Sequence, residues 1–253
     1  MTESRSNLRV LVAAPRPAGR EPMPTRSHVE AMYDALEAQG DRVEAYWLYP
    51  GTPEALAARL SGDDGPAPDV VVLDVAMEMG TEPLAYLESD VPEGGALAAG
   101  ELGAILRQGS AGLVVLRPAR SAGADPANAD AAAGGPARYA DALARQAELA
   151  VLRVDERLDE EALRVAMTAA LAALLAGHAP GEALEEARRA LAEGAPHVNP
   201  AEGLTLHGSG GAPVVASQPG GRGIGKVVRF PGTELQPPWR RLAQEPAEGG
   251  LPL

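Results

Sequence analysis

The stretch Gly220–Lys226 (GGRGIGK) has the glycine and lysine spacing of a loop that cradles phosphate groups. Such a loop also needs a serine or threonine directly after the lysine, which holds magnesium, and it must join a strand to a helix. Here Val227 follows the lysine, and no strand–helix–strand pattern follows in the sequence. The stretch therefore favours a flexible linker over a nucleotide site.

A second glycine-rich stretch, His207–Gly211 (HGSGG), is similar to the loop that forms the oxyanion hole of some esterases. In a hydrolase, His207 would be the base that activates a hydroxyl group. Esterases of that kind also carry their nucleophile in a G-x-S-x-G turn, which this sequence lacks. We expect a polar turn at the end of a strand, with a hydrolase that uses His207 as an alternative.

Asp74 lies near the end of Asp69–Val75 (DVVVLDV), the run with the strongest strand pattern in the sequence. A receiver domain presents its phosphorylated aspartate in this way, after its third strand. That site also needs an acidic pair after the first strand, where this sequence reads LVAAPRP, and a lysine after a later strand. Lys226 is the only lysine in the chain. A degenerate receiver-like signalling domain built on Asp74 is therefore a second alternative.

The composition describes an acidic globular chain without cysteine. Its 253 residues can bury a full-sized core, and 45% of them are hydrophobic. The formal net charge of −13 disfavours nucleic acid and anionic membranes as partners, because both would repel the protein. The absence of cysteine excludes disulfides and thiol nucleophiles, and the four histidines have no metal-ligand spacing. The N-terminus resembles no signal peptide, so we expect a cytoplasmic protein with no metal and no cofactor.

Apolar runs of strand length alternate with helical patterns over most of the chain. Strands are expected at 8–14, 42–49, 69–75, 84–88, 112–116, 149–154 and 203–207. Helices are expected from a capping box at Ser27 to Gly40, from Pro53, at 97–108, at 138–146, from Asp159 and from Pro180. This alternation predicts an α/β fold in which a mostly parallel central sheet lies between helices on both faces. One domain is expected over residues 1–217.

Residues 218–253 are expected to form a flexible or partner-docking tail, because they are rich in glycine, proline and arginine. The candidate docking residues are aromatic side chains, prolines and arginines: Phe230, Pro237, Pro238, Trp239, Arg240 and Arg241. Aromatic residues and arginine are enriched among the residues that dominate binding energy at interfaces. A tail without a role, and a tail that folds back on the acidic body, are the alternatives.

Several stretches taken together resemble the CHAT family, the bacterial relatives of caspases and separase. Residues 68–80 (PDVVVLDVAMEMG) are similar to the family's third strand and the loop after it, and residues 84–108 to its short strand and following helix. Residues 112–123 (GLVVLRPARSAG) resemble the pattern LVVLNACxSA, and residues 171–191 (LAALLAGHAPGEALEEARRAL) resemble the family's paired helices. The resemblance implies a caspase-like three-layer sandwich.

In the CHAT family, a histidine after the third strand and a cysteine after the fourth form the catalytic dyad. Position by position, the histidine falls on Ala76 and the cysteine on Ala119. The resemblance therefore implies an inactive pseudoprotease, since a thiolate nucleophile and its base are both missing. It also implies a bacterial scaffold or regulatory subunit in a defence or cell-death system, with an active protease, a TPR protein or an ATPase as partner. Arg117-Pro118, between the two sites, reads as a proline-rigidified turn.

Overall fold

A single mixed sheet of eight strands forms the centre of the protein, as the computed structural model shows for residues 7–17, 25–63, 65–78, 81–89, 95–120 and 134–214. The strands are β1 Leu8–Ala13, β2 Val43–Trp47, β3 Val70–Glu78, β4 Leu84–Tyr86, β5 Ala96–Leu97, β6 Leu113–Arg120, β7 Ala150–Val154 and β8 Leu204–His207. Their order is β2-β1-β3-β6-β7-β8, and β4 and β5 form a small antiparallel extension beside β3. The strands from β2 to β7 in this row are parallel, and β8 is antiparallel to β7.

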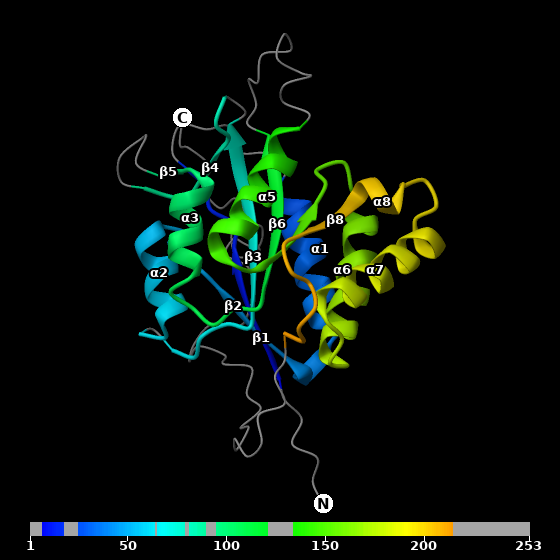
Figure 1. Ribbon diagram of the computed structural model, residues 1–253. Helices are drawn as coiled ribbons and strands as arrows, with labels where there is room; N and C mark the ends of the chain where they lie inside the picture. The colour runs from blue at the N-terminus through cyan, green and yellow to red at the C-terminus, as the bar shows by residue number, and fades with distance from the viewer. Residues whose placement is uncertain are drawn as a thin grey trace, which may run out of the picture.

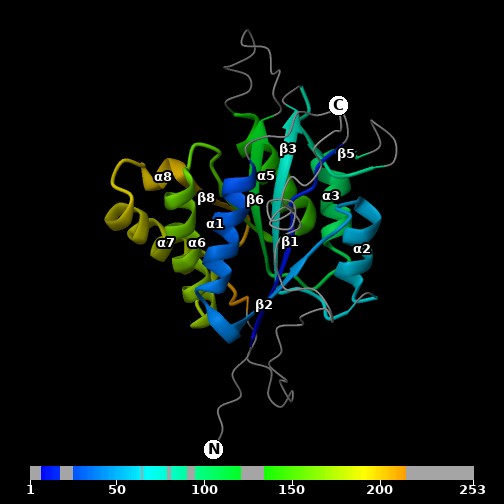
Figure 2. The ribbon, with the colours of Figure 1, turned by 180° about the vertical axis from the view of Figure 1, so that it is seen from behind.

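Helices cover both faces of the sheet, so the α/β prediction with three layers is confirmed (Figures 1 and 2). The helices are α1 Thr25–Glu37, α2 Pro53–Ser61, α3 Ala99–Leu106, α5 Gly135–Ala147, α6 Glu160–Leu175, α7 Pro180–Gly194 and α8 Pro200–Gly203, with a short 3-10 turn at Gly40–Arg42. α1 packs against α6 on one face, and α7 packs against α6. α2, α3 and α5 lie on the other face.

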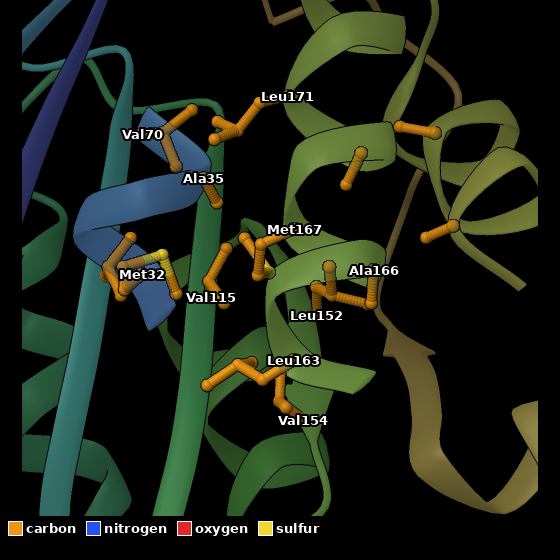
Figure 3. Packing of buried hydrophobic residues seen from close by; sticks show 14 of the residues in the cluster. Met32, Ala35, Val70, Val115, Leu152, Val154, Leu163, Ala166, Met167 and Leu171 are labelled. Carbon is orange, nitrogen blue, oxygen red and sulfur yellow. The ribbon is translucent and has the colours of Figure 1, made fainter. Parts of the chain in front are cut away.

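Two apolar clusters follow from the alternation of side chains along the strands. On one face, the even-numbered residues of β3 and the odd-numbered residues of β6, such as Val70 and Val115, pack against α1 and α6. Figure 3 shows this cluster, with Met32 of α1 and Met167 of α6 closing over the strands. On the other face, the alternate residues of the same strands pack against α2, α3 and α5. We call these the α1/α6 face and the α5 face.

Helix starts follow their sequence signals in several places. The Thr52 hydroxyl accepts a hydrogen bond from the Ala55 amide at 3.1 Å and caps α2, and the Asp159 carboxylate accepts one from the Ala162 amide at 2.8 Å and caps α6. The capping box at Ser27 is wrong, because α1 begins at Thr25 and Ser27 lies within its first turn.

The expected turn at Arg117-Pro118 is also wrong, since both residues lie inside β6. β3 and β6 stay in register from the Val70–Leu113 pair to the Met77–Arg120 pair, and this mutual pairing carries both strands beyond their expected ends. β7 pairs with β6 only as far as Leu116. Pro118 therefore lies where β6 has lost one neighbour, and proline is tolerated at such an edge.

After β8, which is antiparallel to β7, the chain continues towards the edge where the parallel strands begin, as the orange segment in Figure 1 shows. Val214 packs against the core beside Gly112, which lies directly before β6. The last described residue therefore lies at the edge where the parallel strands begin, the amino edge. The stretch Gly220–Lys226 and the six docking candidates of the tail lie outside the described residues. Within the described part of the chain, no helix has the length and apolar character needed to cross a membrane.

Candidate functional site

Ala76 of β3 and Ala119 of β6 are Cα partners on neighbouring parallel strands. Neighbouring strands lie about 4.8 Å apart, and partners in parallel register point to the same face. Ala119 is buried, whereas Ala76 is partly exposed. A histidine and a cysteine at these two positions would therefore lie side by side. The two alanines offer only methyl groups, and so neither a nucleophile nor a base.

Asp74 and Arg117 form the row directly before the two alanines on the same face of the sheet. The Nη1 atom of Arg117 donates a hydrogen bond to Oδ1 of Asp74 at 2.8 Å. The two side chains are only 7% and 8% exposed, so this is a buried ion pair. β3 was expected to end at Val75 but continues to Glu78, so Asp74 lies within the strand rather than near its end.

Burial raises the pKa of Asp74, because an ionised carboxylate loses its hydration inside the protein. The Arg117 cation acts in the opposite direction, and His28 of α1 does so more weakly. His28 also lies with its Nε2 3.1 Å from the Leu158 carbonyl oxygen, just before α6. The starts of α1 and α6 are thus tied together beside the ion pair.

Tyr86 of β4 lies on the other side of Ala76, because these two residues are Cα partners in the antiparallel extension. Its hydroxyl donates a hydrogen bond to Oε2 of Glu78 at 2.7 Å. The row across the end of the site is therefore Tyr86, Ala76 and Ala119, and the contact between Tyr86 and Glu78 lies at its rim. We call Asp74, Arg117, Ala76, Ala119 and Tyr86 together the carboxyl-edge site.

Glu88 ties the loops at this edge together. One of its carboxylate oxygens accepts a hydrogen bond from the Arg16 amide at 3.0 Å, and the other accepts one from the Gly51 amide at 2.8 Å. These loops follow β1 and β2, and β1 is where the strand order reverses, since the chain passes first to β2 and then across to β3. In open α/β sheets, ligands bind outside the carboxyl ends of the strands at such a reversal.

His207 ends β8 on the α5 face and has a hydroxyl within reach. Its Nε2 lies 3.3 Å from Oγ1 of Thr205, and its Nδ1 lies 4.0 Å from Oδ1 of Asp141 in α5. The Thr205 hydroxyl also accepts a hydrogen bond from Nε of Arg153 at 3.0 Å. Burial lowers the pKa of His207, the Arg153 cation lowers it further, and Asp141 acts in the opposite direction.

Metal ligands do not gather in the described residues, where no group of three or more histidine, aspartate or glutamate side chains could hold an ion. The candidate sites therefore consist of the carboxyl-edge site and the cluster around His207. Comparison of the chain with protein-family models, and with curated proteins, gives no match.

Sequence reasoning located Asp74, Ala76, Ala119 and His207, and the structure brings the first three together around Arg117. It missed Arg117, which was assigned to a turn. A signal for Arg117 was present in the sequence. Arg117 follows Leu113 and Val115 at a spacing of two residues, as Asp74 follows Val70 and Val72 in β3, so each charged residue shares a face with the apolar residues before it. The contact between Thr205 and His207 could also have been expected, because residues two apart on a strand point to the same face.

Proposed function

We propose that this protein is a catalytically inactive, CHAT-like pseudoprotease that acts as a protein-binding subunit. The observation that supports it most directly is the register of Ala76 and Ala119. Two motifs, matched separately in the sequence and far apart along it, place their key residues opposite each other on adjacent strands.

The strand order also supports this reading. The sheet keeps a reversal at β1, and the carboxyl-edge site lies at the edge where such sheets bind ligands. The methyl groups of Ala76 and Ala119 remove the covalent step, while the ion pair and Tyr86 keep polar groups for binding. A fold retained without its chemistry is what a binding role requires.

The partner we propose is another protein, of the active-protease, TPR or ATPase type, in a cytoplasmic bacterial defence or cell-death system. The acidic charge of −13 favours a protein surface over nucleic acid or an anionic membrane. The tail residues from Phe230 to Arg241 are proposed as a second docking segment.

The test fills the carboxyl-edge site without touching the core. Ala76→Trp adds bulk at a partly exposed position, and Ala172→Trp, on the exposed side of α6, is the matched control. We expect affinity capture from the native host to recover a partner with the unchanged protein and with Ala172→Trp, and at least tenfold less with Ala76→Trp. Equal recovery with both variants would contradict the proposed site.

Two further measurements separate the body from the tail and from catalysis. A protein shortened after Gln218 should keep the partner if the carboxyl-edge site is sufficient, and lose it if the tail provides the main contact. The unchanged protein should cleave no member of a broad peptide library. Cleavage that survives Ala119→Val but disappears in Thr205→Val would transfer the function to the His207 cluster.

That cluster supports the second candidate function, a hydrolase. The Thr205 hydroxyl lies 3.3 Å from a histidine nitrogen, and burial lowers the pKa of His207, which favours the neutral imidazole that a general base needs. The test is hydrolysis of p-nitrophenyl acetate. Turnover that Thr205→Val and His207→Gln both abolish would support this candidate, and turnover unchanged by them would dismiss it.

A further inference from the structure

β2 ends the row of strands on one side of the sheet (Figure 2), and among the described strands it pairs with β1 alone. The Val12 carbonyl oxygen of β1 accepts a hydrogen bond from the Leu48 amide at 2.9 Å, directly after β2. In a parallel ladder, the residues whose backbone groups face the neighbouring strand alternate along the chain. Every second residue of β2 therefore directs its backbone N–H and C=O groups away from β1: Val43, Ala45 and Trp47.

The outward backbone groups of Ala45 are open. This residue is partly exposed, and neither its N–H nor its C=O has a hydrogen bond with any described residue. The other end of the row is different, because Leu204 of β8 has both of its backbone groups occupied. Its N–H donates to the Pro200 carbonyl oxygen, and its own carbonyl oxygen accepts from Nη2 of Arg188 at 2.8 Å. An edge strand with open backbone groups is a template on which another strand can pair.

Aromatic side chains gather around the same strand. The chain has two tryptophans, five tyrosines and one phenylalanine, and half of these lie on β2 or beside it: Tyr33, Tyr46, Trp47 and Tyr49. Tyr33 of α1 stacks on Trp47 with the ring centroids 6.5 Å apart, and both residues remain partly exposed. Tyr49 is 81% exposed. Aromatic residues are enriched at protein interfaces, so this edge carries side chains of the kind that a partner strand would cover.

The sequence of β2 is complementary to itself when two copies run antiparallel. If Ala45 lies opposite Ala45 of a second copy, these two residues exchange both of their N–H···O=C hydrogen bonds. On the α1/α6 face, Val43 of each copy then lies opposite Trp47 of the other, which is a favourable β-branched–aromatic pair. On the α5 face, Glu44 of each copy lies opposite Tyr46 of the other. The Tyr46 hydroxyl already donates to Glu44 within one copy at 3.1 Å, so these two groups match.

Charge distinguishes this register from the neighbouring ones. A shift by two residues in one direction places Glu44 directly opposite Glu44 of the second copy, and like charges in that position are destabilising. A shift in the other direction pairs Val43 and Glu44 with residues beyond the end of β2. In the register centred on Ala45, each Glu44 instead faces a tyrosine that carries a cation beside it. The guanidinium carbon of Arg59 lies 4.1 Å from the centroid of the Tyr46 ring.

We infer that a second copy of this chain binds along β2, antiparallel and with its two-fold axis at Ala45, so that the sheets of the two copies join into one. Such an interface uses the same surface on both copies, and it closes at the dimer. The formal net charge of −13 on each copy opposes association, so the dimer should become tighter when salt screens this repulsion. The inference does not depend on the proposed function, because the carboxyl-edge site lies on β3, β4 and β6.

The first test measures the mass of the full chain by sedimentation velocity over a range of concentrations. Ala45→Pro removes the N–H at the centre of the interface, and the ladder with β1 stays complete because that N–H faces away from β1. Ala45→Ser keeps the N–H and is the matched control. We expect a dimer for the unchanged protein and for Ala45→Ser, and a dissociation constant at least tenfold higher for Ala45→Pro. Circular dichroism of Ala45→Pro checks that its fold is retained.

Three results of this measurement would overturn the proposal. The first is a monomer at every concentration, and the second is the same dissociation constant for Ala45→Pro and Ala45→Ser. The third is a dissociation constant that rises when sodium chloride is added, because it would indicate an ionic contact elsewhere on the surface.

Single cysteines test the register without requiring Ala45→Pro to fold, because the chain has no cysteine of its own. In the proposed pairing, the Cα atoms of the two copies of Ala45 lie about 5.5 Å apart, a separation that a disulfide spans. With diamide as the oxidant, Ala45→Cys should form a covalent dimer at least tenfold faster than Ala172→Cys. The latter thiol lies on the exposed side of α6 and measures random collision. Equal rates for the two variants would overturn the proposal.

A mixture of two variants tests the neighbouring row. Residue 44 of one copy lies opposite residue 46 of the other, so Glu44→Cys mixed with Tyr46→Cys should cross-link several-fold faster than either variant alone. Faster cross-linking of Glu44→Cys with itself would contradict the register centred on Ala45.

Hydrogen exchange distinguishes a second copy from other occupants of this edge. The Ala45 N–H should exchange more slowly as the protein concentration rises, because binding of a second copy depends on concentration. Slow exchange in a monomeric protein, equal at all concentrations, would mean that another segment of the same chain covers β2, and would overturn the proposal. Ala76→Trp should leave the dissociation constant of the dimer unchanged. The failure of the dimer is therefore distinguishable from the failure of the carboxyl-edge site.

Discussion

Ala76 and Ala119 stand opposite each other on β3 and β6, and each presents a single methyl group to the same face. The spacing of adjacent strands sets the distance between the two Cβ atoms, so larger side chains at these positions would lie next to each other. Side chains with complementary chemistry would be held in contact by the sheet itself.

The first prediction follows from that spacing. The double variant Ala76→His/Ala119→Cys should fold, and the imidazole beside the introduced thiol should lower its pKa, because a nearby imidazolium stabilises the thiolate. The pH profile of iodoacetamide alkylation should therefore lie at lower pH in the double variant than in Ala119→Cys alone. Identical profiles in the two variants would show that the side chains do not meet. Ala172→Cys supplies the profile of an exposed thiol.

The second prediction concerns the cap of α6. Hydrogen bonding from the Ala162 amide, and next from His197, lowers the pKa of Asp159. Because the pKa of Asp159 is lower in the native than in the unfolded protein, the ionised carboxylate stabilises the fold at pH values above its unfolded pKa. This stabilisation is lost as the pH falls through the native pKa. Asp159→Ala should therefore reduce the free energy of unfolding by about 1 kcal/mol at neutral pH and by less near pH 3. Urea unfolding of both proteins at the two pH values measures this.

Asp159→Asn is the matched variant for this cap, because asparagine also accepts from the first-turn amides. It should lose much less stability at neutral pH than Asp159→Ala. Equal losses in the two variants would mean that the charge facing His197, rather than the cap, provides the stabilisation.

The third prediction compares two glycines with left-handed backbone. Gly177 has φ +87° and open space around the position of a Cβ atom, whereas Gly208 has φ +80° and a Cβ there would lie 2.5 Å from the Leu149 carbonyl oxygen. Gly177→Ala should cost about 1 kcal/mol from backbone strain alone. Gly208→Ala should cost clearly more, because the turn after β8 must also move. Thermal unfolding of the two variants gives the order, and the reverse order would contradict this account of the turn.

Local signals predicted the fold well where the pattern was continuous. DVVVLDV and GLVVL are short runs rich in β-branched residues, and both form the buried strands that this pattern predicts. The proline or capping signals at Thr52, Asp159 and Pro180 located the helices that follow. The strand ends were set by pairing that a local pattern does not contain. β3 and β6 support each other from Val70 to Met77, so a proline that normally ends a strand is retained within one.

The candidate site was harder to predict, because its central contact joins residues far apart in the sequence. Asp74 was identified from its own run, but its partner lies on another strand, and the register that joins them depends on the whole sheet. Thr205 and His207 are two positions apart on one strand, so their contact was within reach of the alternation rule. Asp141 was not, since it comes from α5.

The last prediction tests the energetics of the buried pair. Arg117→Met leaves the Asp74 carboxylate buried without its cation, and should reduce the free energy of unfolding by about 3–5 kcal/mol at neutral pH. Asp74→Leu/Arg117→Met removes both charges and should be far less destabilised than the single variant. The exposed pair of Arg145 and Asp141 is the control, and Arg145→Met should cost at most about 1 kcal/mol.

The stability lost in Arg117→Met should depend on pH, and the direction of the pKa shift of Asp74 gives the sign of this dependence. Because burial raises the pKa of Asp74, and loss of Arg117 removes the main opposing influence, the native carboxyl of Arg117→Met should bind a proton more readily than the unfolded one. When the native pKa of this carboxyl lies above its unfolded pKa, the stability that proton binding contributes is fully present below the unfolded pKa. It is lost as the pH rises through the native pKa. The deficit of Arg117→Met should therefore shrink at about pH 4 and be largest near pH 8. A deficit independent of pH would mean that Arg117 contributes by packing and not as the cation that neutralises Asp74.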